Sequence, residues 1–414
     1  MGHGRIAFSA LLDPIPGVEV FFPPDVNRDI VKIGAQYSPE FVCLPFKITL
    51  GEFINMHKKY GIDTFVQATD CGPCRFGFYA PVQERIMKDL GYDVEIIPIA
   101  QEDILNFRWL KTFYRLTNVE DKFMRMVDIV RCIRLFFLKS KYLEDIRTIE
   151  GFVRCREVNK GETTEIVENL LEKLHKENNI YALHSFSNII KNEFEKMEIN
   201  REIEPLRVKF AGENHVCLES FANMDLVKKL GEEGVEVHLG NTLYDWIMHK
   251  CRINFHRKEL AHIGKEYIPL DIGGEAQWVI GDYIKSQEEG LDGFIHVYPF
   301  TCMPENSARG ILEGQSPNPF YLPIQFYSLD EHTGYEGLRT RIEAFIELMK
   351  SNRRNNPRFQ DTYVEPKLIS EIWDKKEENI LEDFMEGMVK PFMKTTEILG
   401  KSLFSALSES ENNQ

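Results

Sequence analysis

Three cysteines of this chain share one local pattern of neighbours. The pattern occurs in the stretches EFVCLPFK, ATDCGPCRF and PFTCMPENS. In each stretch the cysteine follows an apolar segment of extended character, a proline comes two residues later, and a helical pattern begins. Proline is favoured in the first turn of a helix, where its missing N–H is no loss. The pattern predicts that Cys43, Cys71 and Cys302 lie where strands end and helices begin.

Positions of this kind are suited to a metal centre. In open α/β sheets, ligands bind at the carboxyl ends of the strands. The helices that follow stabilise anions at their N-termini and are expected to lower the pKa of a thiol there. Three thiolates that converge on one such edge describe a metal site. Because Cys302 lies far along the chain from Cys43 and Cys71, two domains have to close on each other to assemble it.

The stretch CGPC, from Cys71 to Cys74, allows two other interpretations. It has the spacing of a thioredoxin-type redox motif, but that role leaves the same pattern at Cys43 and Cys302 as a coincidence. A structural zinc site could use all four of these cysteines. Zinc sites usually draw on local cysteine pairs, however, and the chain has one such pair here.

Buried thiols and an iron–sulfur cluster are the remaining interpretations. Simple burial suits Cys132 and Cys155, which lie in helical surroundings, whereas Cys217 and Cys251 stay undecided. An iron–sulfur cluster is bound by soft thiolates and can keep an open coordination position. We favour the cluster over the other three interpretations.

Charge and composition narrow the possible partners. The 414 residues carry a formal net charge of −15, so the surface as a whole repels nucleic acid and anionic membranes. The apolar run VDIVRCIRLFFLKS is broken by Arg131 and Arg134, well short of the ~20 residues that span a bilayer. Residues 1–13 lack the layout of a signal peptide. We therefore expect a soluble, cytoplasmic protein with reduced cysteines and with neither nucleic acid nor membrane as a partner.

Strand-like and helix-like segments alternate in two parts of the chain. Helical spacing of apolar residues separates the expected strands, which are residues 18–22, 40–43, 63–69 and 93–99 in the first part and 206–212, 235–240 and 292–298 in the second. This alternation predicts an α/β fold with two Rossmann-like (flavodoxin-like) parallel-sheet domains, a helical insertion and a helical C-terminus. The expected boundaries are 1–100 for the α/β domain with the Cys43 and Cys71 motifs, 101–203 for the insertion, 204–333 for the α/β domain with the Cys302 motif, and 334–414 for the C-terminal helices and tail.

Longer stretches around these cysteines carry a family resemblance. They are VCLPFKITLGEFI, DCGPCRFGFYAPVQERIMKDLGYDVEII, AGENHVCLESFANMDLVKKLGEEGVEV, DIGGEA, FIHVYPFTCMPE and SLDEHTGYEGLRTRIEAFIEL. In this order they resemble the 2-hydroxyacyl-CoA dehydratase superfamily, and more narrowly its branch of proteins related to acyl-CoA dehydratase activases. The resemblance extends from Val18 to about Met349.

The resemblance implies a cofactor and its ligands. Family members bind an iron–sulfur cluster through three cysteines of this type, which implies Cys43, Cys71 and Cys302 as ligands, with Cys74 as an addition typical of the branch. The implied cluster is a 4Fe-4S centre. The related double-cubane cluster proteins hold a fused 8Fe-9S cluster and reduce small molecules, which is the alternative. A further alternative is a cluster-carrying electron relay or scaffold without a substrate.

The resemblance also implies partners. Dehydratases receive one electron from an ATP-dependent activase with its own iron–sulfur cluster, and the electron forms a ketyl radical on an acyl-CoA substrate. This chain has no Gly-x-x-x-x-Gly-Lys-Ser/Thr motif, so ATP hydrolysis would belong to the partner. Because family members are dimers, we expect a homodimer.

The sequence offers few candidates for acid or base catalysis. Glu305 is expected in the first turn of a helix, where the helix dipole would stabilise its charge. Glu213 and His215 are expected in a loop after a strand, and His296 is expected as a hydrogen-bonded core histidine. His332 lies within a family motif. None of these residues is assigned a catalytic role.

Overall fold

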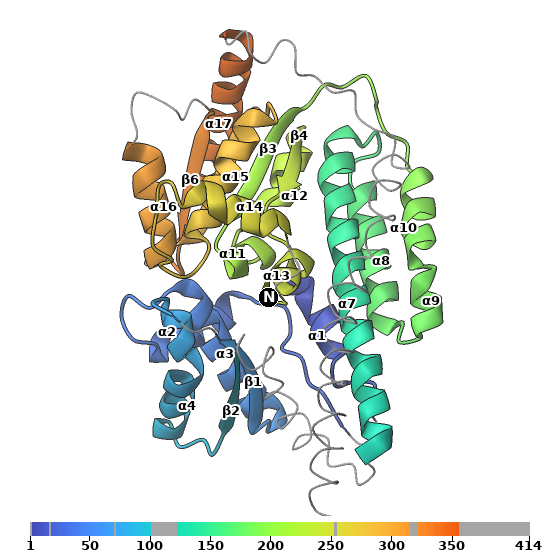
Figure 1. The fold of residues 1–414 in the computed structure, drawn as a ribbon, viewed down its shortest axis with the longest axis vertical. Helices are drawn as coiled ribbons and strands as arrows, with labels where there is room; N and C mark the ends of the chain where they lie inside the picture. The colour runs from blue at the N-terminus through green and yellow to red at the C-terminus, as the bar shows by residue number, and fades with distance from the viewer. Residues whose placement is uncertain are drawn as a thin grey trace, which may run out of the picture. The chain divides into compact units, whose positions relative to one another are not determined.

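Four parallel strands form the centre of the second α/β region, residues 204–333 (Figure 1). The strands are β3 (Leu206–Gly212), β4 (Val235–Leu239), β5 (Gly293–Pro299) and β6 (Ile324–Leu329). Their order in the sheet is β4-β3-β5-β6. The chain therefore leaves β3 towards β4 on one side and continues with β5 on the other. The carboxyl ends of β3 and β5 flank this reversal, which is the place where open α/β sheets bind their ligands.

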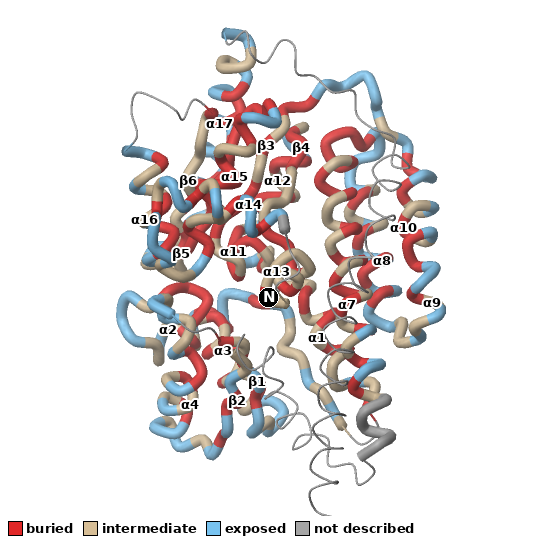
Figure 2. Tube along the Cα trace, viewed as in Figure 1, coloured by how far each residue is buried: buried red, intermediate tan, exposed pale blue. Residues whose placement is uncertain are grey.

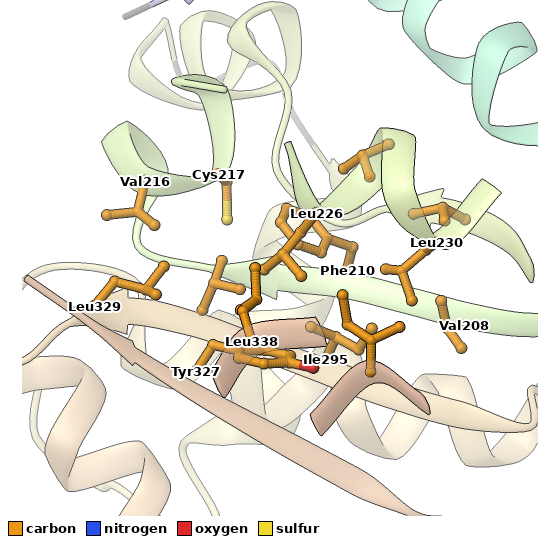
Figure 3. Close-up of a cluster of buried hydrophobic side chains, with 14 of the residues drawn as sticks. Val208, Phe210, Val216, Cys217, Leu226, Leu230, Ile295, Tyr327, Leu329 and Leu338 are labelled. Atoms are coloured by element: carbon orange, nitrogen blue, oxygen red, sulfur yellow. The ribbon is translucent and has the colours of Figure 1, made fainter. Parts of the chain in front are cut away.

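Helices cover both faces of this sheet, which explains why all 7 residues of β5 are buried. Successive side chains of a strand point to opposite faces. Ile295 packs in a core with α12 and α17, whereas Phe294 packs in a second core with α15 and α16. Figure 3 shows Ile295 gathered with Phe210 and Leu226 in the first of these cores. The helices of this part are α11 (Asn214–Leu218), α12 (Leu226–Glu232), α13 (Leu243–Lys250), α14 (Phe255–Gly264), α15 (Ala276–Glu288), α16 (Met303–Gly314) and α17 (Tyr335–Asn355).

The structure is a computed structural model that describes residues 2–15, 18–69, 72–100, 122–251, 255–314 and 322–355. These residues belong to one compact unit of the chain. Cys71, the start of the expected helical insertion and the expected C-terminal tail lie outside the described residues.

The first α/β region, residues 1–100, contains a smaller parallel sheet. Its strands are β1 (Thr64–Thr69) and β2 (Glu95–Ala100), which pair along their whole length. Burial alternates along β1, because its side chains point in turn to the core and away from it. The helices of this region are η1 (Gly2–Gly4), α1 (Arg5–Ser9), α2 (Arg28–Tyr37), α3 (Leu44–Tyr60), η2 (Arg75–Phe78) and α4 (Tyr79–Asp89).

Two strands expected in the first region are absent. Residues 18–22 are extended but pair with no strand among the described residues, and they lead into Pro23 and Pro24, which have no N–H to donate to a ladder. Glu40 and Phe41 form a turn in which Phe41 has a φ of 57°, and Val42 and Cys43 belong to no strand. Cys43 therefore does not follow a strand, and that part of the prediction was wrong.

Helix α3 connects the two α/β regions. At Gly34 of α2 and Gly51 of α3 the backbones of the two helices approach so closely that an added Cβ would overlap the facing backbone. Leu44 and Ile48, in the first turns of α3, belong to the same core as Leu329 and Leu338 of the second region. The residue that follows Cys43 is thus anchored in the core of the second region.

Helices make up most of the described part of the insertion, which also has an isolated β-bridge between Glu157 and Ile199. The helices are α7 (Lys122–Val153), η3 (Arg154–Arg156), α8 (Glu162–Lys176), α9 (Ile180–His184) and α10 (Phe186–Glu195). Helix α7 contacts β4 and α13 of the second region. Cys132 in α7 and Cys155 in η3 are buried, as expected.

The α/β class with two parallel sheets is confirmed, and buried residues gather around β3 and β5 in the interior of the second region (Figure 2). Strand β6 was missed by the sequence prediction. Helix α17 matches the helix expected after Gly334. Among the helices of the described residues, none combines the length and the apolar character needed to cross a membrane.

Candidate functional site

Cys43 is the N-cap residue of α3, and Pro45 lies in the first turn, as the Cys-x-Pro pattern predicts. Its thiol is buried, and its Sγ lies 2.6 Å from the hydroxyl oxygen of Tyr79, the first residue of α4. The ring of Tyr79 meets the ring of Phe46 edge-on at 5.1 Å. The side chain of Cys43 is therefore held between the starts of two helices.

Cys74 lies at the N-cap of η2. The next residue, Arg75, donates from Nη1 to the carbonyl oxygen of Phe41 at 2.7 Å. The segment after Cys74 is thus joined to the segment before Cys43. Strand β1, which leads to Cys71, ends at Thr69. Cys71 itself lies outside the described residues, so its predicted position stays a prediction.

Cys302 follows β5 and precedes α16, as predicted. Its N–H donates to the carbonyl oxygen of Pro299 at 2.9 Å, and its own carbonyl oxygen accepts from the Asn306 side chain at 2.7 Å. Its sulfur accepts a hydrogen bond from the backbone of Glu305. The carboxyl end of β5 and the first turn of α16 thereby fix the cysteine.

A glycine turn of the second region lies between Cys74 and the helix that follows Cys302. Gly273 and Gly274, in the DIGGEA stretch, both have positive φ angles, of 75° and 63°. Gly273 lies against the backbone of Cys74, and Gly274 lies against the ring of Pro304. Segments of three different parts of the sequence thus meet at this edge.

Burial, and not the helix N-terminus, controls the protonation of these thiols. It raises the pKa of Cys43 to about 11, although the hydrogen bond with Tyr79 acts in the opposite direction. Burial is the main reason why the pKa of Cys302 lies well above its ordinary value. The negative charges of Glu305 and Glu213 raise it further, and the charge of Cys43 adds a smaller part. The expected lowering of thiol pKa values was wrong at Cys43 and Cys302. In the absence of a metal both thiols are protonated at neutral pH.

Glu305 and His296 form a buried pair behind Cys302. Both side chains are fully buried, and His296 Nε2 lies 2.7 Å from Glu305 Oε2. Burial raises the pKa of Glu305 to about 8 and lowers that of His296 to about 3. Glu305 therefore stays protonated at neutral pH and donates to a neutral imidazole. The expectation that the helix dipole stabilises a charged Glu305 was wrong, because desolvation outweighs the dipole.

Two further carboxyl groups lie at the same edge. Glu213 follows β3 and accepts from the backbone N–H groups of His215 and Val216, at 3.0 and 2.9 Å. Glu213 is half-buried, and burial raises the pKa of its carboxyl group to about 7. Burial likewise raises the pKa of Glu275, before α15, to about 8. When Glu305 is ionised, its charge adds to both shifts.

Asparagines connect these carboxyl groups to the sheet. Asn241, after β4, accepts from the N–H of Gly212 at 3.1 Å and donates to Asn214 Oδ1 at 2.7 Å. Asn214 in turn donates to Glu275. The ends of β3 and β4 and the start of α15 are therefore joined by one chain of hydrogen bonds.

The sequence comparisons can now be set beside this geometry. Neither a protein-family model nor a curated protein matches this chain. The functional conclusion therefore rests on the chemistry of the residues around Cys43, Cys74 and Cys302.

The donor set determines which group the edge could bind. Soft thiolates favour zinc or an iron–sulfur cluster over magnesium or calcium. Among the described residues, no three His, Cys, Asp or Glu side chains are grouped so as to hold a single metal ion. A cluster does not require such a group, because its cysteines bind different iron atoms. The segments that carry Cys43, Cys74 and Cys302 meet at one edge between the two α/β regions, which we call the cysteine edge, and cysteine thiolates are the ligands that iron–sulfur clusters use.

The structure adds residues that sequence reasoning missed. Tyr79 and Glu275 carried no local signal, because their roles depend on tertiary contacts. The Gly-Gly pair of DIGGEA is a turn signal that could have been used. His332, in contrast, is mostly exposed. His215 is buried, and desolvation lowers its pKa well below the ordinary value.

Proposed function

We propose that this protein binds an iron–sulfur cluster at the cysteine edge and uses it for radical or reductive chemistry, as in the 2-hydroxyacyl-CoA dehydratases that it resembles. The observation that supports this most is that the segments carrying Cys43, Cys74 and Cys302 lie against one another beside the reversal of strand order between β3 and β5: Arg75 donates to Phe41, and Gly273 and Gly274 contact Cys74 and Pro304. The proposed ligands are these cysteines together with Cys71.

A bound low-potential cluster would supply one-electron chemistry. The protein residues would hold the protons that such chemistry consumes. Glu305 keeps a proton at neutral pH and shares it with His296 within the buried pair. Glu213, with a pKa of about 7, is divided between its two forms. Proton donors of this kind suit both the loss of a hydroxyl group and the reduction of a small molecule.

The proposed electron donor is an ATP-dependent activase with its own iron–sulfur cluster. Large apolar side chains are exposed beside the cysteine segments, among them Phe41, Phe78, Phe300 and Met303. Exposed apolar residues that gather in one place are a common feature of protein interaction sites. The proposal also includes a homodimer and a cytoplasmic location, where thiols stay reduced.

A double-cubane reductase is the second candidate, and the position of Cys74 favours it. Cys74 lies near enough to Cys43 for its charge to raise the Cys43 pKa. A fourth thiolate at the edge would allow a larger cluster than three ligands require. It would also leave less room for an open iron site.

Metal analysis of protein purified without oxygen tests the proposal. Iron, acid-labile sulfide and zinc are measured per chain for the wild type, Cys43→Ala and Cys302→Ala. Cys132→Ala, a buried cysteine of α7, is the matched control. A 4Fe-4S cluster predicts about four irons per chain, and a double cubane predicts about eight. Both cysteine variants at the edge are expected to lose most of this iron, and the control is expected to keep it.

Two outcomes would count against the proposal. One zinc per chain, lost in the same variants, would indicate a structural zinc site. Equal iron in all four proteins would mean that the cysteine edge is not where the metal binds. If iron is bound as expected, the ratio of iron to chain decides between the two candidate functions.

A further inference from the structure

The turn at Gly273 and Gly274 touches both cysteine segments. A Cβ added to Gly273 would lie 3.2 Å from the Cβ of Cys74 and 3.3 Å from its backbone nitrogen. A Cβ added to Gly274 would lie 2.8 Å from Cγ and 2.9 Å from Cβ of Pro304, two residues after Cys302. Neither position has room for a side chain without a shift of its neighbour.

The second α/β region holds this turn in place. The N–H of Gly273 donates to Asp271 Oδ1 at 2.9 Å, and the side chain of Gln277 donates to the carbonyl oxygen of Ile268 at 2.8 Å. Glu275, directly after the turn, accepts from Asn214. The turn is thus anchored on one region and lies against Cys74 of the other.

We propose that the turn at Gly273 and Gly274 is a clamp that sets the distance between the Cys74 and Cys302 segments, and that this distance lets their thiols bind one common prosthetic group. The first part concerns the protein alone. The second part rests on the proposed function. Glycine is required because both φ angles are positive and because both contacts would be occupied by a Cβ.

The test compares Gly273→Ala and Gly274→Ala with Gly234→Ala. Gly234 has a φ of 81° and also lies in the second region, but a Cβ added there would meet no atom within 4 Å. It reproduces the backbone strain of the two test variants without their contacts. A difference between the test variants and this control therefore reports the contacts with Cys74 and Pro304.

The first measurement uses iron-free, reduced protein. The alkylation rates of Cys74 and Cys302 by iodoacetamide are followed by peptide mass spectrometry, with Cys251, which lies outside the cysteine edge, as an internal reference. Displacement of the turn is expected to raise the rate at Cys74 by about tenfold in Gly273→Ala, through easier local opening. The ratio of the Cys74 rate to the Cys251 rate is expected to stay at the wild-type value in Gly234→Ala.

The second measurement uses protein loaded with iron and sulfide without oxygen. The electron paramagnetic resonance spectrum of the dithionite-reduced protein and the iron content are recorded for each variant. We expect both to change in Gly273→Ala and Gly274→Ala and to match the wild type in Gly234→Ala. Gly274→Ala combined with Pro304→Ala removes Cγ of the ring, and it is expected to regain part of the wild-type spectrum.

The two parts of the proposal can fail separately. If Cys74 and Cys302 are alkylated at wild-type rates in both test variants, the turn does not set their distance, and the clamp is rejected. If the rates change but the wild type binds no iron, the clamp stands and the proposed function is rejected. If the rates change while iron content and spectrum stay at wild-type values, the turn does not serve a common prosthetic group.

Discussion

The two α/β regions place different chemistry at the same edge. The first region contributes Cys43 and Cys74, and the hydrogen-bonding partner of Cys43 is another polar side chain, Tyr79. The second region contributes Cys302 together with Glu213, Glu275 and Glu305, three carboxyl groups whose pKa values are raised by burial.

The difference follows from the two sheets. Strand β5 is buried on both faces, so polar groups at its end are desolvated and keep their protons. In the first region the sheet of the described residues has two strands, and β1 is buried on alternate residues. We infer a division of tasks: the first region mainly supplies thiols, and the second region supplies one thiol and the protons.

The pH dependence of stability tests the buried carboxyl groups, and Glu305→Gln is expected to give the largest effect. Below about pH 4.5, Glu305 is protonated in both states; between there and about pH 8 only the folded state keeps the proton, so the contribution of Glu305 to stability falls as the pH rises. At ~1.4 kcal/mol per pKa unit, the loss is at most about 5 kcal/mol. Urea unfolding of iron-free protein at several pH values measures it.

Glu305→Gln removes this titration and should flatten the dependence on pH. Glu343→Gln, in the exposed part of α17, is the control and should leave it unchanged. A pH dependence in Glu305→Gln identical to that of the wild type would contradict a buried, protonated Glu305. The proton supply assigned to the second region would then lose its main support.

Matched phenylalanines test whether the two sheets differ in packing. Phe294 of β5 is fully buried and packs against the ring of Tyr283, whereas Phe65 of β1 faces a single core and packs against Phe53. Phe294→Ala is expected to lower the free energy of unfolding by about 4 kcal/mol. Phe65→Ala is expected to cost about 3 kcal/mol, since a smaller sheet can relax around the cavity.

Urea unfolding measures both losses, and Val66→Ala is the control. Val66 is 42% exposed, so its loss should stay within about 0.5 kcal/mol. Equal losses for the two phenylalanines, or a larger one at Phe65, would show that the small sheet is packed as rigidly as the large one.

Local signals in the sequence predicted a good part of this arrangement. The helix starts after Cys43 and Cys302 were predicted because proline in a first turn acts within a few residues. Strands β3, β4 and β5 of the second region were predicted because apolar residues alternate along β3 and β4 and nearly fill β5. Strand β6 was missed, since IQFYSL is short and carries polar residues.

Properties that depend on tertiary contacts could not be predicted in this way. Residues 18–22 have the composition of a strand, but no described strand lies beside them. The helix N-termini suggested lowered thiol pKa values, and burial reversed the sign at Cys43 and Cys302. Glu305 was expected to be charged for the same reason. For the thiols and for Glu305, the sequence indicates the electric field of the helix N-terminus, and only the fold determines the desolvation that opposes it.

Removing the hydrogen bond between Tyr79 and Cys43 tests whether polar contacts support the thiols of the first region, and it is expected to give the smallest effect on stability. Tyr79→Phe keeps the ring contacts with Phe46 and Phe76 but removes the hydroxyl that lies 2.6 Å from the sulfur. We expect the free energy of unfolding of iron-free protein to fall by about 1 kcal/mol in urea, because a typical buried hydrogen bond contributes this much.

The same variant should also change the thiol. The hydrogen bond lowers the Cys43 pKa against the effect of burial, so its loss should raise that pKa further and slow alkylation at alkaline pH. Tyr181→Phe, on an exposed tyrosine of α9, is the control for both measurements. Faster alkylation in Tyr79→Phe would mean that the hydroxyl shields Cys43 more than it stabilises the thiolate. An unchanged rate and stability would mean that packing alone holds Cys43, and that the first region presents its thiols without polar support.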